Sequence, residues 1–152
     1  MPLYIVRHAK AGSRSTWTED DAVRPLTVAG VAQAEAIAEA LASLAVGPCL
    51  SSPYLRCLQT LAPLADRLGL SVLPDDRLAE GAPFEPALAL LEDVSEGAVL
   101  CSHGDLIPDL LDALVRRGMS ADGLPTGVKK AAIVVVHRES GRFVRAEHRP
   151  AP

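Results

Sequence analysis

The chain has 152 residues, 49% of them hydrophobic and 22% charged, and its formal net charge is −4. This length and composition predict one globular domain over residues 1–152 and exclude an intrinsically disordered chain. The negative charge argues against a nucleic-acid-binding protein, which would show a basic face. We find no apolar run near ~18 residues and no signal peptide, so we expect no membrane span.

The amino-terminal stretch begins as a strand and ends in basic residues. Residues 3–6 are apolar and mostly β-branched or aromatic, which is typical of a buried strand. Arg7, His8 and Lys10 follow them. Side chains at the carboxyl end of a strand in an open α/β sheet reach the crevice where ligands bind. We therefore predict an anion site that contains a histidine.

The next segment, residues 12–24, is polar and has no sustained period, so we predict a loop over this site. It contains Arg14, the single tryptophan Trp17, and three consecutive acids at 19–21. Trp17 would be a packing anchor for the loop or a wall of the pocket, and a packing anchor is the more common case.

A first helix is predicted after this loop. Thr27 is its expected N-cap, and Gly47-Pro48 would end it. The residues that form an apolar stripe at helical spacing are Val31, Ala34, Ile37, Ala38, Leu41 and Leu44.

A very short strand at residues 49–52 leads to a second predicted helix. Ser52 is the expected N-cap of that helix and Pro53 its first residue. Arg56 lies in its first turn, and Gly69 ends it. Cys49, Cys57 and Cys101 are far apart and form no CxxC pair. We expect buried, reduced thiols in a cytoplasmic protein and no zinc site.

The second half of the chain repeats the alternation of strands and helices. Strands are predicted at 70–73, 97–102, 131–136 and 143–148, and helices at 86–92 and 106–117. Glu80 lies in the loop after the first of these strands, and His103-Gly104 follows the second. The alternation predicts an α/β fold with a mainly parallel sheet and a terminal antiparallel hairpin.

Two of these strands end in the same way, with His8 and His103 each placed just past an apolar run. If both strands are parallel and central, both imidazoles lie at one edge of the sheet. Arg56 follows a third strand within the first helical turn, where backbone N–H groups also favour anions. Arginine is suited to bidentate binding of phosphate.

This set of side chains suits phosphoryl transfer through a histidine. A neutral imidazole attacks phosphorus and gives a phosphohistidine, while cationic side chains stabilise the charge on the transferring group. A carboxylic acid protonates the leaving oxygen, and its carboxylate then activates water. Because the arginines provide the positive charge, we expect neither a metal nor a cofactor.

An ordered set of motifs supports this chemistry: Arg7-His8 after the first strand, Arg56 in SSPYLRCLQT, Glu80 in LAEG, and His103-Gly104 after a late strand. The set resembles the histidine phosphatase superfamily, also called phosphoglycerate mutase-like, from residue 3 to about 114. The resemblance implies a three-layer α/β/α sandwich. It also implies that His8 is the phosphorylated nucleophile, that Arg7, Arg56 and His103 bind the phosphoryl group, and that Glu80 is the proton donor.

Two subfamilies are similar to this chain. The RHAK motif at 7–10 and RPLTxxGxxQA at 24–34 resemble the short SixA-type phosphohistidine phosphatases. The short segment between Glu80 and His103 implies a small lid and an open crevice, which suits a protein or an extended substrate. RHAKAGSRSxW with an acidic run before RPL also resembles the phosphatase-like domain fused to Nudix domains in some actinobacterial nucleotide hydrolases, although this chain has no Nudix segment.

Several residue roles stay open at this point. Asp105, just after His103-Gly104, is an alternative general acid to Glu80, and it could instead cap the next helix. Lys10 and Arg24 are candidate substrate-binding residues, and each could equally be a solvated charge. Lys129-Lys130 is interpreted as the flank of a strand.

The leading functional hypothesis is a metal-independent, SixA-like phosphatase with a phosphohistidine intermediate. Its partner would be a phosphohistidine protein or a small phosphorylated metabolite. One alternative is a nucleotide or small-metabolite phosphohydrolase, and an alternative of another class is a non-catalytic phosphate-binding module. A mutase is disfavoured because the short segment after Glu80 leaves little material to retain an intermediate.

Overall fold

A computed structural model describes residues 1–152. The elements in chain order are β1 (Leu3–Arg7), a 3-10 turn (Asp21–Val23), α1 (Val28–Leu41), β2 (Cys49–Ser51), α2 (Leu55–Leu68), β3 (Val72–Pro74), a second 3-10 turn (Asp76–Leu78), α3 (Phe84–Asp93), β4 (Val99–Ser102), α4 (Leu106–Arg116), β5 (Ile133–Glu139) and β6 (Arg142–Arg149). Every strand and helix expected from the sequence is present, with shifted ends.

The six strands form one sheet in the order β3-β2-β4-β1-β5-β6. The first four strands of this order are parallel, whereas β5 pairs antiparallel with both β1 and β6. The prediction of a mainly parallel sheet with a terminal antiparallel hairpin is therefore confirmed. Because β1 and β4 are neighbours in the middle of the sheet, their carboxyl ends meet at one edge.

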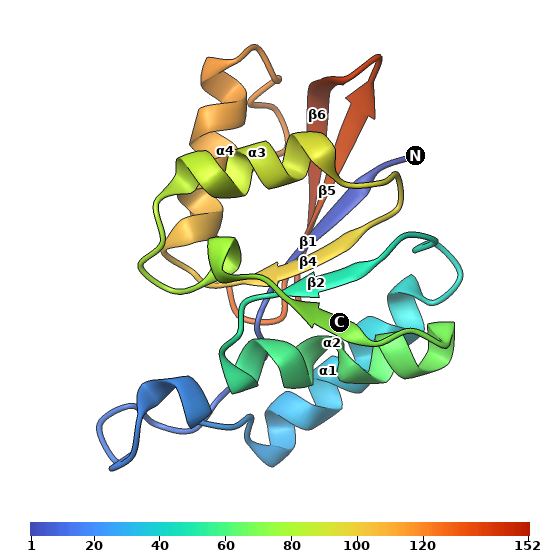
Figure 1. Cartoon of the computed structure of the whole chain (residues 1–152). Helices are drawn as coiled ribbons and strands as arrows, with labels where there is room; N and C mark the ends of the chain where they lie inside the picture. Colours follow the sequence, from blue (N-terminus) through green and yellow to red (C-terminus); the bar gives the residue numbers. More distant parts are fainter.

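Helices cover both faces of the sheet, and Figure 1 shows α1 and α2 on one side and α3 and α4 on the other. Alternation along β1 divides the core between these sides. Leu3 and Ile5 pack in the cluster that includes α3 and α4, whereas Tyr4 and Val6 pack in the cluster that includes α1 and α2. The predicted three-layer α/β/α sandwich is confirmed.

The expected apolar stripe of α1 is wrong at two positions. Val31 is 49% exposed and Leu44 is 38% exposed. Gly30 takes the inward position instead. An added Cβ at this residue would lie 2.0 Å from the Lys10 carbonyl oxygen, so only glycine fits against that backbone. The helix also ends at Leu41, before Gly47-Pro48, in a tightened turn that buries Ala45 rather than Leu44.

The expected N-cap of α2 is also wrong. The helix begins at Leu55 with Tyr54 as its N-cap residue, and no side chain caps it. The Ser52 hydroxyl instead lies 2.8 Å from Nε2 of His103, so this serine belongs to the site at the sheet edge. Thr27 does cap α1, because its Oγ1 accepts from the Gly30 amide.

All three cysteines are free and buried, as the sequence predicts. None of the helices combines the length and the apolar composition needed to cross a membrane.

Candidate active site

The two strand-end histidines lie together at the carboxyl edge of the sheet. Parallel pairing of β1 with β4 aligns Arg7 with Ser102, so His8 and His103 follow at the same level. Their ring centroids are 5.4 Å apart, and the residues are 5% and 1% exposed. The structure therefore brings together the pair that the sequence pattern indicated.

One ring nitrogen of His8 is hydrogen-bonded to the backbone. Nδ1 lies 2.8 Å from the Ala9 carbonyl oxygen, and since a carbonyl can only accept, Nδ1 carries the proton. The lone pair of the neutral ring is therefore on Nε2. Burial, reinforced by the charges of His103, Arg56 and Arg7 and opposed by the Ala9 carbonyl, lowers the His8 pKa to about 3. The ring is thus neutral and nucleophilic at pH 7.

His103 is held from behind by residues of the β2–α2 connection. Ser52 Oγ accepts from the Tyr54 amide and lies 2.8 Å from His103 Nε2, and Cys57 Sγ lies 3.5 Å from the same nitrogen. The tautomer that accepts a hydrogen bond from the serine at Nε2 carries its proton on Nδ1. Nδ1 is buried and has no hydrogen-bond partner, so this nitrogen is free for a ligand.

The two arginines are anchored by their terminal nitrogens. Arg7 donates from Nη1 to the Val128 carbonyl at 2.8 Å. Arg56, which is fully buried in α2, donates from Nη1 to the Asp21 carbonyl at 2.9 Å and from Nη2 to the Asp21 carboxylate at 3.0 Å. Arg56 also lies over the Tyr54 ring, 4.9 Å from its centroid. Both guanidinium groups are therefore fixed before any ligand binds.

The anchored groups leave three buried nitrogens without partners: Nε of Arg7, Nε of Arg56 and Nδ1 of His103. Buried donors almost always have a hydrogen-bond partner, so an unpartnered donor requires an explanation. These three surround His8, whose pKa all three residues lower through their charges. Unpartnered N–H donors gathered near one histidine are suited to binding an oxyanion.

Asp21 joins the loop over the site to its base, and the sequence reasoning missed it. Its carboxylate accepts from Arg24 Nε at 2.9 Å as well as from Arg56. Burial acts to raise the Asp21 pKa, but hydrogen bonds and charge from Arg24 and Arg56 outweigh it and lower the pKa. The only sequence signal was the acidic run at 19–21, which does not tell which of the three acids points inward.

The two candidate acids occupy different positions. Glu80 Oε1 lies 2.9 Å from Arg14 Nη2, 3.4 Å from Arg56 Nη2 and 3.9 Å from His103 Nδ1. Asp105 instead accepts from the Gly81 amide at 2.8 Å and makes no capping bond in α4. The Glu80 carboxylate thus reaches the cationic group, whereas Asp105 holds the loop that carries Glu80.

An open cleft of about 560 Å³ lies in front of His8. The residues that line it are Arg7, His8, Lys10, Ala11, Gly12, Ser13, Arg14, Arg24, Thr27, Glu80, Gly104, Asp105 and Lys130. Lys10 and Arg24 are therefore at the cleft, but Arg24 bonds Asp21 and the Gly12 carbonyl and so braces the loop. Lys130, which the sequence reasoning assigned to a strand flank, is a cleft residue.

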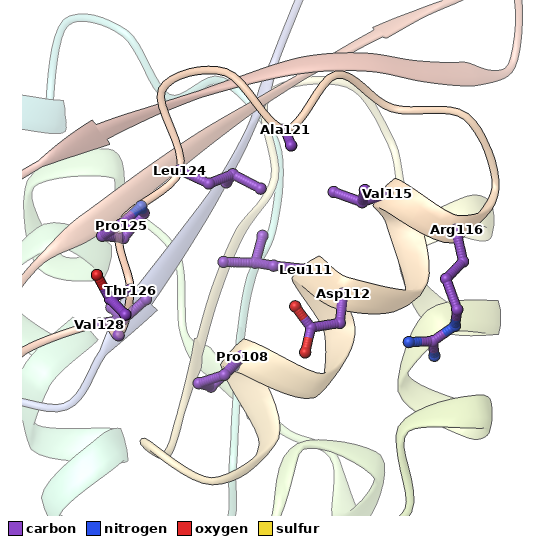
Figure 2. Close-up of a pocket in the computed structure, with 11 residues that line it drawn as sticks. Pro108, Leu111, Asp112, Val115, Arg116, Ala121, Leu124, Pro125, Thr126 and Val128 are labelled. Atoms are coloured by element: carbon purple, nitrogen blue, oxygen red, sulfur yellow. The ribbon is translucent and has the colours of Figure 1, made fainter.

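A separate pocket of about 430 Å³ lies between α4 and the segment that follows it. Figure 2 shows Leu111, Val115 and Leu124 turned toward this space. The pocket contains neither histidine of the pair and none of the three unpartnered donors. No group of three or more His, Cys, Asp or Glu side chains could hold a metal ion. The candidate active site is therefore the cleft in front of His8.

A model of the histidine phosphatase superfamily (branch 1) matches residues 3–83, more than half of the chain. The chain belongs to the histidine phosphatase superfamily. The resemblance seen in the motifs is confirmed, and with it the enzyme class, a phosphatase hydrolase.

Among curated proteins, the 8-oxo-(d)GTP phosphatase of Mycolicibacterium smegmatis is 31% identical to this chain over 156 residues. The alignment covers 99% of this chain but 48% of the relative. The chain therefore spans about half the length of that relative.

Solved structures share the fold along nearly the whole chain. The protein histidine phosphatase SixA complexed with tungstate has 27% identity and a TM-score of 0.77, covering 97% of this chain and 96% of the other. A candidate phosphohistidine phosphatase SixA from Agrobacterium tumefaciens has 28% identity and a TM-score of 0.75, covering 90% and 91%. The expected phosphoglycerate mutase-like fold is thus confirmed.

Proposed function

We propose that residues 1–152 form a single histidine phosphatase domain that hydrolyses phosphoryl groups through a phosphohistidine at His8. The observation that carries this proposal is the set of three unpartnered N–H donors around a neutral imidazole whose free nitrogen is Nε2. Arg7, Arg56 and His103 would bind the phosphoryl oxygens. The tungstate in the related SixA structure supports an oxyanion site, since tungstate is a tetrahedral oxyanion like phosphate.

In the first step, His8 Nε2 attacks phosphorus, and the bond to the leaving oxygen breaks. The fixed guanidinium groups and the His103 N–H stabilise the charge on the transferring group and need no reorganisation as it forms. Glu80 protonates the leaving oxygen. In the second step its carboxylate takes a proton from water, which attacks the phosphohistidine and releases phosphate. Because Arg7 and Arg56 supply the positive charge, we propose that the reaction needs no metal.

Two substrate classes have specific support. Likeness to SixA proteins above 25% identity and the open cleft support a phosphohistidine on a protein partner. Alignment of the whole chain with the 8-oxo-(d)GTP phosphatase supports a nucleotide or another small phosphorylated metabolite. A non-catalytic phosphate-binding module is the alternative of another class, and the free Nε2 of His8 speaks against it.

The proposal is tested by mixing the protein with 32P-labelled acetyl phosphate and quenching at alkaline pH. We expect an acid-labile, alkali-stable phosphoenzyme that is absent from a His8→Gln variant, and turnover of p-nitrophenyl phosphate that is unaffected by EDTA. Full turnover by His8→Gln would overturn the assignment of the nucleophile. Tight phosphate binding without hydrolysis of any ester would indicate a binding module. Loss of activity in EDTA, restored by a divalent cation, would overturn metal independence.

A further inference from the structure

The cleft in front of His8 carries more positive charge than one phosphoryl group requires. Five cationic side chains line it against two carboxylates, in a chain whose formal net charge is −4. The nitrogens that we assign to the phosphoryl group belong to Arg7, Arg56 and His103. Two of these, Arg56 and His103, are buried and are not among the residues that line the cleft. The phosphoryl site therefore does not explain the other cationic side chains that line the open side of the cleft.

Three of the cleft cations already have partners. Arg7 bonds the Val128 carbonyl, Arg14 bonds Glu80, and Arg24 bonds Asp21. The ammonium groups of Lys10 and Lys130 make no hydrogen bond or ion pair within the chain. They come from opposite halves of the sequence and meet at the same opening. An unpaired pair of lysines beside a phosphoryl site is suited to a second anionic group.

Lys130 is held at the opening by the backbone. The next residue, Ala131, donates its amide to the carbonyl oxygens of Arg7 and His8 at 3.2 and 3.1 Å. Ala131 has a φ of +64°, a left-handed conformation that costs a non-glycine residue about 1 kcal/mol or more. Such conformations persist only where the surroundings enforce them, and they concentrate at functional sites. The strained residue fixes the turn that carries Lys130, just before β5 and next to the nucleophile.

The ammonium of Lys130 lies among positively charged side chains. Burial, followed by the positive charges of Arg7, Arg24, Lys10 and Arg14, lowers the Lys130 pKa. The charges that act most strongly on this ammonium are thus positive. An anion bound here would relieve their mutual repulsion as well as form its own contacts.

We propose that Lys10 and Lys130 form a second anion subsite, and that the preferred substrates carry a terminal phosphoanhydride, with two neighbouring phosphoryl groups. This inference rests on the proposed phosphatase function and names the substrate class for the same cleft. The terminal phosphoryl group lies against Arg7, Arg56 and His103. The next phosphoryl group, which is the leaving group, lies against the two lysines.

The chemistry of the step is consistent with this arrangement. His8 Nε2 forms a bond to the terminal phosphorus, the bond from that phosphorus to the bridging oxygen breaks, and the electron pair stays on the leaving phosphate. Water then hydrolyses the phosphohistidine, so that R–O–PO₂–O–PO₃ and water give R–O–PO₃ and inorganic phosphate. The leaving phosphate has a second pKa of about 6 and needs little protonation at pH 7, whereas its added charge is stabilised by the lysines.

The first test compares kcat/KM for ADP and inorganic pyrophosphate with kcat/KM for AMP and p-nitrophenyl phosphate. We expect the anhydrides to be preferred, and the ratio of ADP to p-nitrophenyl phosphate to fall about 10-fold in each of Lys10→Gln and Lys130→Gln, since a charge-assisted contact is lost. Lys129→Gln is the matched control, because this neighbour does not line the cleft, and it should keep the ratio. Comparison of kcat/KM for ADP with kcat/KM for pyrophosphate tells whether the nucleoside contributes to substrate preference.

The second test measures binding without turnover. Calorimetry with methylenediphosphonate and with phosphate should show at least 10-fold tighter binding of the diphosphonate. That advantage should be lost in the Lys10→Gln/Lys130→Gln double variant and kept in Lys129→Gln. Equal affinities, an advantage that persists in the double variant, or a higher kcat/KM for a phosphohistidine protein than for every anhydride would overturn the inference. If no phosphate ester is hydrolysed at all, the proposed function fails, and calorimetry still decides the subsite.

Discussion

The carboxylate of Asp21 lies 3.0 Å from Nη2 of Arg56, and the Asp21 carbonyl oxygen lies 2.9 Å from Nη1. One residue of the loop over the site therefore holds both terminal nitrogens of a fully buried guanidinium. Nε of Arg56 is buried and has no hydrogen-bond partner, so it is free for the proposed phosphoryl site. Asp21 thereby links the fold of residues 12–24 to the orientation of a side chain deep in α2.

Asp21→Ala should loosen both the loop and Arg56. The buried guanidinium would lose a charged partner, so we expect the free energy of unfolding to fall by about 2 kcal/mol and kcat to fall about 10-fold. Urea denaturation and steady-state kinetics measure these effects. Asp20→Ala is the control, because the Asp20 side chain only accepts from the Ala22 amide. Equal losses in both variants would show that the contact with Arg56 does not matter.

Because the pKa of His8 is low, we predict that the stability of the protein depends on pH. A histidine has a pKa of about 6.5 in the unfolded chain, whereas His8 in the folded chain has a pKa of about 3. Its contribution to stability is therefore fully present above pH 6.5 and is lost as the pH falls toward 3. At pH 4 the loss amounts to about 3 kcal/mol.

We therefore expect His8→Gln to lose less stability between pH 7 and pH 4 than the unchanged protein does, while His137→Gln serves as the control. The His8 C2–H resonance in NMR should show no titration between pH 5 and 8. A midpoint near 6.5 would contradict the assigned burial and charge effects.

Gly104 is predicted to be intolerant of a side chain. An added Cβ would lie 2.5 Å from Cζ of Arg7 and 2.8 Å from its Nε. Because the Val128 carbonyl holds the guanidinium, Gly104→Ala should displace Arg7 and lower kcat/KM by 10-fold or more, through loss of a charge-assisted contact. Gly127→Ala is a suitable control, since nothing lies within 4 Å of its added Cβ. A Gly104→Ala variant with unchanged kcat/KM would show that Arg7 need not be fixed.

The two candidate acids can be separated by substitution. Glu80→Gln should lower kcat for an alkyl phosphate by about 10²- to 10⁴-fold, since general acid catalysis is lost. Asp105→Asn should have a smaller effect, because it weakens only the bond to the Gly81 amide. The fall in kcat caused by Glu80→Gln should be smaller for p-nitrophenyl phosphate than for the alkyl phosphate, because the nitrophenolate leaving group needs less protonation. The opposite ranking of the two variants would assign the acid to Asp105.

The strand ends that carry His8 and His103 could be predicted from the sequence because the signal is local. Each histidine directly follows or nearly follows a continuous apolar run, and the alternation of strands and helices predicts parallel pairing. Arg56 was found in the same way, from its place in the first turn of a helix. For these residues, position along the chain is enough to predict the sheet edge where they meet.

Asp21, Ser52 and Lys130 were missed or misassigned because their roles depend on tertiary contacts. Ser52 has the sequence features of an N-cap, but its hydroxyl bonds His103, which is distant in the sequence. Lys130 precedes an apolar strand like many flanking lysines, and only the pairing of β5 with β1 brings it to the cleft. In the acidic run at 19–21, the inward residue is selected by Arg24 and Arg56 rather than by any local pattern.

The pairing of β1 with β4 has a consequence for how the protein folds. Two imidazoles and the arginines around them meet only after the first strand has closed a long loop with a strand from the last third of the chain. Contacts of such high sequence separation form slowly, because their loop-closure entropy must be overcome first. During refolding, the capacity to bind an oxyanion should therefore appear late, after the helical circular dichroism signal, and in step with the docking of β4.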